Sequence, residues 1–236
     1  MTSTTRDNST AMKTFGTISG FFLIGPTLGA IVSACAGTLT SIEPSDSSTH
    51  LGSRTESPGV WQSGVGEGFR PCAQSFSLSA GATYGLSDFG STQAHDLALT
   101  SLTYGHMLGC MWCQNNCFRG NWEFRLELFG GAQFSPSTQW IVGLTPHLRY
   151  NFATGTRWVP FIDAGAGVTG TGIDSPDLAT TFEFNVQGGA GVQYFVASNV
   201  SISLEARYLH ISNAGIKEPN LGLNGITGML GISFFF

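Results

Sequence analysis

Apolar residues recur at every second position over most of the C-terminal two thirds of the chain. One segment reads Trp122, Glu123, Phe124, Arg125, Leu126, Glu127, Leu128. Neighbouring side chains of an extended strand point to opposite faces, so this pattern indicates a strand with one apolar and one polar face. We expect eight such strands, at residues 75–84, 96–108, 122–130, 140–150, 158–169, 182–194, 201–212 and 227–236.

The composition indicates which environment the apolar faces meet. Only 11% of the residues are charged and 42% are hydrophobic, whereas a soluble domain carries about 25% charged residues. The longest apolar run, residues 21–32, is shorter than the roughly 20 residues of a membrane helix. A closed sheet satisfies its own backbone groups and can cross lipid without helices. We therefore predict an all-β fold, an eight-stranded antiparallel transmembrane β-barrel, over residues 74–236.

The polar faces of these strands carry most of the charge. An eight-stranded barrel is filled by side chains, and a cation on the lipid side would cost roughly 2–4 kcal/mol at the bilayer midplane. A soluble lipocalin-like barrel would place charge outside, and this chain has too little charge for that. The charged residues expected to point inward are Glu123, Arg125, Glu127, Arg149, Asp163, Glu183, Glu205 and Arg207.

The N-terminal segment has the parts of a secretory signal. Lys13 precedes an apolar run over residues 14–32, and small residues follow at 33–37. We predict a signal peptide over residues 1–36, with Met12 as the true start. Cleavage after Ala36 is favoured over lipidation at Cys35, because a barrel holds the membrane without a lipid anchor. Residues 37–73, rich in Ser, Thr, Gly and Pro, are expected to form a flexible periplasmic leader.

Four cysteines lie beyond the predicted signal: Cys72, Cys110, Cys113 and Cys117. The last three resemble part of a zinc site but lack the matching second pair. An even number of cysteines in an oxidising compartment indicates two disulfides. The pairing is open, because four cysteines allow three connectivities. We expect no metal and no other cofactor.

Strand order predicts the position of a histidine and a serine. With the N-terminus in the periplasm, the loops after the first, third, fifth and seventh strands are extracellular, so the long loop at residues 213–226 faces outward. His210 and Ser212, two residues apart, share the face assigned to lipid, with Cα atoms about 6.6 Å apart. Such a pair can act as base and nucleophile. The alternative is two interfacial polar residues that contact lipid headgroups.

The residues around this pair carry a family resemblance. His210-x-Ser212-Asn213-Ala214-Gly215, followed by Pro219-Asn220-x-Gly222, resembles the lipid A 3-O-deacylase family of outer-membrane acyloxyacyl hydrolases. The resemblance is sharp over residues 207–224 and weaker through the barrel, including residues 145–150 and 160–165. It implies an eight-stranded barrel in the outer membrane of a Gram-negative bacterium. It also implies a serine esterase that hydrolyses the ester-linked acyl chain at position 3 of lipid A.

The resemblance also assigns roles. It implies that His210 is the general base and Ser212 the nucleophile. Asn220 matches an oxyanion-hole residue, helped by backbone amides near Ala214 and Gly215. The best-known members have a glutamate as third triad member, where this sequence has Asn224. An amide oxygen can still accept a hydrogen bond from the imidazole, and Glu218 is the alternative third member.

The expected partners follow from the barrel and the resemblance. They are lipopolysaccharide through its lipid A, the surrounding outer-membrane lipids, and the barrel assembly machinery. The terminal Phe234-Phe235-Phe236 resembles the aromatic signature that this machinery recognises. The sequence leaves a homodimer open. A net charge of −5 gives no electrostatic reason to expect nucleic acid. The competing function is a non-catalytic structural or adhesive barrel.

Overall fold

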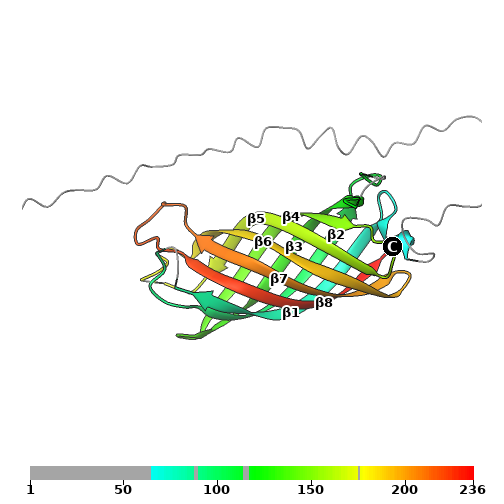
Figure 1. Cartoon of the computed structure of the whole chain (residues 1–236). Helices are drawn as coiled ribbons and strands as arrows, with labels where there is room; N and C mark the ends of the chain where they lie inside the picture. The colour runs from blue at the N-terminus through cyan, green and yellow to red at the C-terminus, as the bar shows by residue number, and fades with distance from the viewer. Residues whose placement is uncertain (1–64, 88–89, 114–116, 175) are drawn as a thin grey trace, which may run out of the picture.

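The computed structural model describes residues 65–236 except 88–89, 114–116 and 175 (Figure 1). Eight antiparallel strands close into a barrel in chain order, and β1 pairs with both β2 and β8. Among the described residues, no helix is long and apolar enough to cross a membrane. The strands are β1 (Gln74–Leu86), β2 (Asp96–Met107), β3 (Gly120–Ser135), β4 (Gln139–Phe152), β5 (Trp158–Thr171), β6 (Phe182–Ala197), β7 (Val200–Ser212) and β8 (Leu223–Phe235).

The predicted fold class is confirmed, and all eight expected strands are present. Two boundaries differ most: β3 runs to Ser135 rather than to residue 130, and β8 begins at Leu223 rather than at residue 227. The preceding loop therefore covers residues 213–222, not 213–226, and Asn224 lies in a strand. Cross-strand pairing explains the earlier start: Asn224 pairs with His210, and Leu223 pairs with Ile211, one residue before the end of β7.

The barrel has two ends, seen at the left and right of Figure 1. We call the end with the loops after β1, β3, β5 and β7 the loop end. The other end, where β1 begins and β8 stops, is the terminal end. The sequence prediction assigns the loop end to the extracellular side. Residues 1–64, with the predicted signal peptide, the start at Met12 and the processing at Cys35, lie outside the described residues.

The predicted leader is wrong over its last nine residues. A short 3₁₀-helix η2 (Gly66–Phe69) and the residues around it close the terminal end of the barrel. Phe69 is buried, with its ring 5.2 Å from that of Phe195 and 5.7 Å from that of Phe235. Asn121 on β3 donates a hydrogen bond to Phe69 O at 3.0 Å. Burial of these apolar groups overrides the linker-like composition of this segment.

The prediction of two disulfides among the four cysteines is also wrong. Cys72 is disulfide-bonded, whereas Cys110, Cys113 and Cys117 are free, exposed thiols. The partner of Cys72 is therefore none of these three. The prediction assumed that four cysteines remain after residues 1–36 are cleaved off. Cys35, the fifth cysteine, lies outside the described residues. Cys72 has a left-handed backbone (φ 65°) and donates its amide to Met107 O at 3.2 Å, which fixes it beside the end of β2.

The two faces of the barrel wall are distributed as predicted. Leu78, Leu204 and Leu230 are 60–62% exposed on the outer face. Glu127, Arg149 and Glu183 are 0–2% exposed on the inner face. The outer wall is thus apolar and the polar faces point into the lumen, which is the arrangement that a hydrocarbon surrounding requires.

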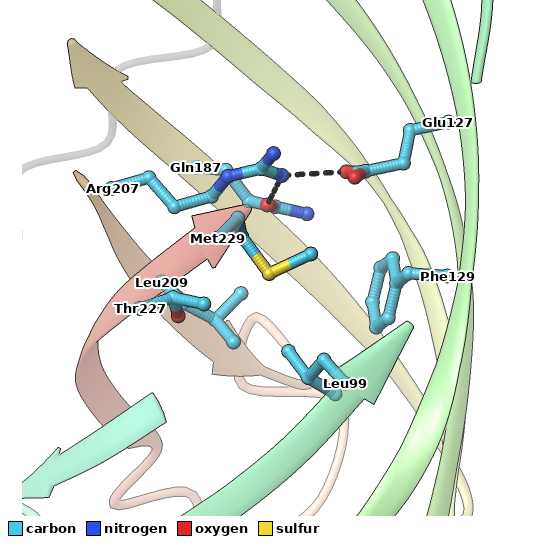
Figure 2. Close-up of a pocket in the computed structure, with 8 residues that line it drawn as sticks. All are labelled: Leu99, Glu127, Phe129, Gln187, Arg207, Leu209, Thr227 and Met229. Atoms are coloured by element: carbon cyan, nitrogen blue, oxygen red, sulfur yellow. Dashed lines mark hydrogen bonds and ion pairs between the residues drawn. The ribbon is translucent and has the colours of Figure 1, made fainter. Parts of the chain in front are cut away.

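The lumen is filled in three layers. The terminal-end layer is apolar and contains Val65, Phe69, Ala73, Met107, Val159, Phe195 and Phe235. The loop-end layer is also apolar and contains Leu97, Leu99, Phe129, Ile141, Ile173, Leu178, Leu209, Ile211, Leu223 and Met229. Charged residues lie between them. Figure 2 shows the boundary, where Arg207, Glu127 and Gln187 meet the apolar side chains around a cavity of about 10 Å³, room for about one water molecule.

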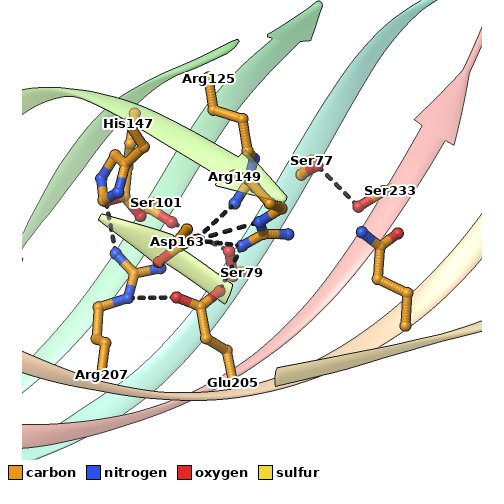
Figure 3. A network of polar contacts seen from close by, with 12 residues as sticks. Ser77, Ser79, Ser101, Arg125, His147, Arg149, Asp163, Glu205, Arg207 and Ser233 are labelled. Atoms are coloured by element: carbon orange, nitrogen blue, oxygen red, sulfur yellow. Dashed lines mark hydrogen bonds and ion pairs between the residues drawn. The ribbon is translucent and has the colours of Figure 1, made fainter. Parts of the chain in front are cut away.

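The middle layer is a network of paired charges (Figure 3). Arg149 Nη2 lies 2.7 Å from Asp163 Oδ2 and 2.8 Å from Glu205 Oε2. Arg207 Nη1 lies 2.7 Å from Glu127 Oε2. The Arg149 guanidinium also lies 3.6 Å from the centre of the Phe161 ring. A buried charge is tolerated only when it is paired, so each arginine holds carboxylates from other strands in place.

We expect Arg149→Met to destabilise the barrel by about 3–5 kcal/mol, because Asp163 and Glu205 would remain buried without this partner. Urea unfolding in lipid vesicles, followed by the gel mobility of unboiled protein, measures the change. Arg157→Met, which removes an exposed arginine, is the matched control and should change stability by about 0.5 kcal/mol or less. Equal urea midpoints for Arg149→Met and wild type would contradict the structural role of the network.

Candidate active site

The site lies where β7 ends and β8 begins, at the loop end of the outer wall. His210 and Ser212 share the outward face of β7 because they are two residues apart. Asn224 is the residue directly opposite His210 on β8, so its side chain lies on the same face. Cross-strand register thus places residues 14 positions apart side by side, which the loop assignment of Asn224 did not foresee.

These three side chains form a hydrogen-bonded chain. His210 Nε2 lies 3.0 Å from Ser212 Oγ, and His210 Nδ1 lies 2.7 Å from Asn224 Oδ1. The amide oxygen can only accept, so Nδ1 carries the proton and Nε2 is free to accept one from the serine hydroxyl. Serine, imidazole and an orienting acceptor therefore stand in the order that nucleophilic catalysis needs.

Two further features were not identified from the sequence. Tyr208, also on the outward face of β7, donates its hydroxyl to Asn224 Oδ1 at 2.6 Å. Gly222, which the motif contains but to which no role was assigned, lies against the histidine. Its backbone has φ +81°, and a Cβ added there would be 3.1 Å from His210 Cε1 and 3.3 Å from Ile211 O. The spacing of Tyr208, two residues before His210, was the available signal.

Glu218, the alternative third member, lies in the loop away from this chain of contacts. It is exposed, and its Oε2 accepts a hydrogen bond from Asn220 N at 3.2 Å. The structure brings Asn224 to His210 Nδ1 instead. Asn224 is also 1% exposed, so its amide is held in a protected position.

The loop after Ser212 is organised by Asn213. Its amide donates to Asn220 Oδ1 at 2.9 Å, and its side chain donates to Lys217 O at 2.8 Å. Its Oδ1 accepts from Gly215 N at 3.0 Å, in a turn where Ala214 and Gly215 both have positive φ. Among the described residues Ala214 N has no hydrogen-bond partner. The three residues expected to form the oxyanion hole therefore differ in the hydrogen bonds they already make, because the Gly215 amide donates to Asn213 within the loop.

Asn220 has a defined amide orientation. Because its Oδ1 faces the donating amide of Asn213, its Nδ2 is left as a donor group directed elsewhere. The contact anchors this donor next to the residue that follows Ser212. Within the described residues, Asn220 Nδ2 and Ala214 N make no hydrogen bond to the rest of the loop, so both stay available as donors.

A second cluster, around buried Asp177, holds the loops together. Its carboxylate accepts hydrogen bonds from Thr92 N at 2.8 Å, Thr92 Oγ1 at 2.7 Å and His95 Nε2 at 2.8 Å. Its carbonyl accepts from the amides of Leu221 and Gly222, both at 3.1 Å. The loop between β5 and β6 is thereby fixed to the β1–β2 loop and to the residue packed against His210.

The fourth loop joins the same cluster through His95. His95 Nδ1 lies 2.6 Å from Gln133 Oε1, and Gln133 Nε2 donates to Ser137 O at 2.9 Å in the β3–β4 loop. All four loops at this end of the barrel are therefore connected through Asp177. The sequence offered no signal for this contact, because Asp177 and its partners are far apart in the chain.

Apolar side chains surround the site on the membrane side. Phe184 pairs with Ser212 and Val186 with His210 on β6, and both are exposed on the outer wall. Ile226, two residues beyond Asn224, is also exposed. The polar chain of contacts thus borders a surface suited to hydrocarbon. No group of three or more His, Cys, Asp or Glu side chains within the described part of the chain could hold a metal ion.

The fold and site define an outer-membrane β-barrel that carries a serine–histidine–asparagine arrangement on its outer wall. The model of the lipid A 3-O-deacylase (PagL) family matches residues 100–233. This match covers more than half of the chain, so the chain belongs to that family. The family and the apolar outer wall together place it in the outer membrane.

Two curated relatives and two solved structures extend the comparison. Lipid A deacylase PagL of Pseudomonas aeruginosa is 35% identical over 117 residues, 48% of this chain and 64% of that protein. Lipid A deacylase PagL of Bordetella bronchiseptica is 34% identical over 119 residues, 45% of this chain and 62% of that protein. The chain therefore spans less than two thirds of the length of these relatives.

Two solved structures resemble this chain at low sequence identity. The outer membrane enzyme PagL is 24% identical with a TM-score of 0.48, over 66% of this chain and 97% of that one. Neisserial surface protein A is 16% identical with a TM-score of 0.51, over 70% of this chain and 97% of that one. The second likeness concerns the fold alone.

We expect Gly222→Ala to reduce catalysis without unfolding the barrel. The new methyl group meets the His210 ring, and φ +81° strains any residue other than glycine. Displacement of the imidazole should lower kcat by about tenfold or more, while the gel mobility of unboiled protein stays that of a folded barrel. Gly90→Ala, at φ +104° and open to solvent apart from one carbonyl at 3.7 Å, controls for backbone strain alone. Equal losses in both variants would mean that contact with His210 is irrelevant.

We also expect acid to loosen the loops through Asp177. Burial raises the pKa of this carboxyl group, but the hydrogen bonds from Thr92 and His95 outweigh it and lower the pKa below its ordinary value. The group therefore stabilises the folded loops above pH of about 3.9 and loses this contribution as pH falls through its lowered pKa. The amide NMR signals of Thr92 and Gln93 should titrate with a midpoint below about 3.9 and stay flat in Asp177→Asn. A midpoint above that value would refute this assignment.

Proposed function

We propose that the protein is a serine esterase that removes the ester-linked 3-O-acyl chain from lipid A in the outer membrane. The observation that carries this proposal is the chain of contacts from Ser212 through His210 to Asn224, at 3.0 and 2.7 Å, on the membrane-facing wall. Membership of the lipid A 3-O-deacylase family supports the substrate class. A substrate that lies in the bilayer reaches this surface laterally, without entering the barrel.

The contacts support a two-step acyl transfer. His210 Nε2 takes the hydroxyl proton as Ser212 Oγ attacks the ester carbonyl carbon. The tetrahedral intermediate collapses, the bond to the sugar oxygen breaks, and that oxygen leaves with the proton from His210. Water then attacks the acyl-enzyme, again giving a proton to His210, and the fatty acid leaves as Ser212 recovers its hydroxyl proton.

The oxyanion in both steps needs donors close to Ser212. Ala214 N and Asn220 Nδ2 fit this role, since the Gly215 amide is bound to Asn213 Oδ1. Removal of one oxyanion donor from a serine hydrolase costs about 10²–10³ in kcat. Phe184, Val186 and Ile226 form the apolar surface against which the acyl chain would lie.

Asn224 sets this protein apart from members with a glutamate at this position. Its amide oxygen orients the imidazole but offers no full charge to the imidazolium. Neutral hydrogen bonds contribute about 0.5–1.5 kcal/mol and those to charged groups about 1.5–3 kcal/mol. We therefore expect the turnover rate to depend more on the orientation of His210 than on stabilisation of its imidazolium charge.

The proposed partners in the membrane are lipopolysaccharide and the surrounding lipids. The proposed partner during insertion is the barrel assembly machinery. Phe234 and Phe236 are about half exposed on the outer wall, where another protein could recognise them, while Phe235 packs inside. A homodimer stays a prediction.

We expect Ser212→Ala and His210→Ala each to abolish deacylation while the barrel stays folded. Their effects should not add in the double variant, because members of one catalytic unit fail together. Asn224→Ala should lower the rate by less than either, since it only orients the base. Mass spectrometry of lipid A from cells that make each variant measures the loss of one hydroxyacyl chain.

Glu218→Ala is the matched control for the third member and should keep its activity. A silent Asn224→Ala together with a severe Glu218→Ala would transfer that role to Glu218. Full activity in Ser212→Ala would overturn the proposed mechanism. Unmodified lipid A in cells that make folded wild-type protein would favour the non-catalytic barrel.

A further inference from the structure

We infer that Tyr208 is a positioning residue that selects the oxygen end of the Asn224 amide for His210, and thereby the catalytic tautomer of the imidazole. Tyr208 Oη donates to Asn224 Oδ1 at 2.6 Å, and His210 Nδ1 donates to the same oxygen at 2.7 Å. The kinetic part of this inference rests on the proposed function. The tautomer itself does not.

The need for such a residue arises from the chemistry of asparagine. The two ends of a carboxamide have similar shape, but one accepts hydrogen bonds and the other donates them. If Asn224 presented Nδ2 to His210, Nδ1 of the ring would have to accept, and the proton would move to Nε2. That tautomer cannot take a proton from Ser212 Oγ.

A tyrosine hydroxyl resolves this choice when it donates. Two donors converge on Asn224 Oδ1, so turning the amide would replace both hydrogen bonds with donor–donor contacts. Asn224 is 1% exposed, which removes water as a substitute partner for most of its surface. A buried polar group left without a hydrogen bond keeps its full desolvation penalty, so the Tyr208 contact biases the amide strongly toward one orientation.

The strand register explains why Tyr208 reaches this oxygen. Asn224 pairs with His210, so Tyr208 is its diagonal neighbour, a separation of about 7–8 Å between Cα atoms that aromatic side chains can span. On β6, the residue opposite Tyr208 is Gly188, which has no side chain to hold the ring on that side. Both features direct the phenol toward β8.

A glutamate at residue 224 would not need this selection. Its two carboxylate oxygens both accept, so either can receive the proton of His210 Nδ1. Tyr208 is therefore important because the third member here is an amide. Removing the hydroxyl should damage the Asn224 protein and be tolerated when the third member is a carboxylate.

The test compares four folded proteins: wild type, Tyr208→Phe, Asn224→Glu, and the double variant. With Asn224 present, Tyr208→Phe should lower kcat about fivefold to tenfold with little change in KM, as expected for loss of one hydrogen bond. In the Asn224→Glu background the same substitution should change kcat by less than about twofold. Tyr84→Phe is the control, because Tyr84 is an exposed tyrosine of the same wall, on β1.

The alternatives give different results. If Tyr208 only contacts the lipid substrate, its loss raises KM equally in both backgrounds, which overturns the inference. A purely structural role lowers the unfolding midpoint in both backgrounds without any dependence on residue 224, and this also overturns it.

A second measurement does not depend on activity. The ¹⁵N signals of the His210 ring in detergent-solubilised protein report which nitrogen carries the proton. We expect protonated Nδ1 in wild type and in Asn224→Glu, and a mixture of tautomers in Tyr208→Phe. If wild type does not deacylate lipid A, the proposed function fails while this measurement still decides the inference. An unchanged tautomer in Tyr208→Phe would refute it.

Discussion

Every backbone amide and carbonyl group within the hydrocarbon has to be paired by the protein itself, because lipid offers no hydrogen bonds. The closure between β1 and β8 meets this requirement, and the ladder between β7 and β8 follows from the same closure. That ladder puts Asn224 opposite His210. The geometry of the candidate active site therefore results from strand pairing. His210 and Asn224 are paired strand residues, and Ser212 is the last residue of β7.

The same constraint inverts the usual distribution of side chains. Apolar residues cover the wall, and the charged residues on the polar faces of the strands are confined to a lumen where they have to neutralise one another. This leaves the outer surface almost without polar groups, so the hydrogen-bonded chain from Ser212 to Tyr208 is conspicuous. Polar side chains on such a surface need hydrogen-bond partners within the protein. Each of these four side chains has one.

Much of this could be predicted from the sequence, for identifiable reasons. A period of two is a local property, so the strands and the inward direction of Glu127 or Arg149 follow from residues within one segment. The start of β8 was misplaced because Asn224 and Gly225 interrupt the alternation, and a partner on another strand decides their conformation. Ser212 and His210 could be found because they are two residues apart. The same spacing puts Tyr208 on their face, but its contact with Asn224, like the contacts of Asp177, joins segments far apart in the chain and could not be read from one segment.

The errors at residues 65–73 and at the cysteines share a cause. Residues 65–73 were interpreted from composition, although Phe69 has aromatic partners at the far end of the chain. The cysteines were interpreted from their number, although pairing depends on which thiols the fold brings together. The structure of residues 65–73 and the pairing of the cysteines are both set by tertiary contacts, which composition and residue counts do not reveal.

The three-layered lumen has an electrical consequence. An ion that entered from either end would first meet an apolar layer of aliphatic and aromatic side chains, then fixed charges that already neutralise one another. Transfer of a charge into such a layer costs many times the thermal energy. The barrel therefore does not conduct ions. A membrane could hold many copies of this protein and keep its high electrical resistance.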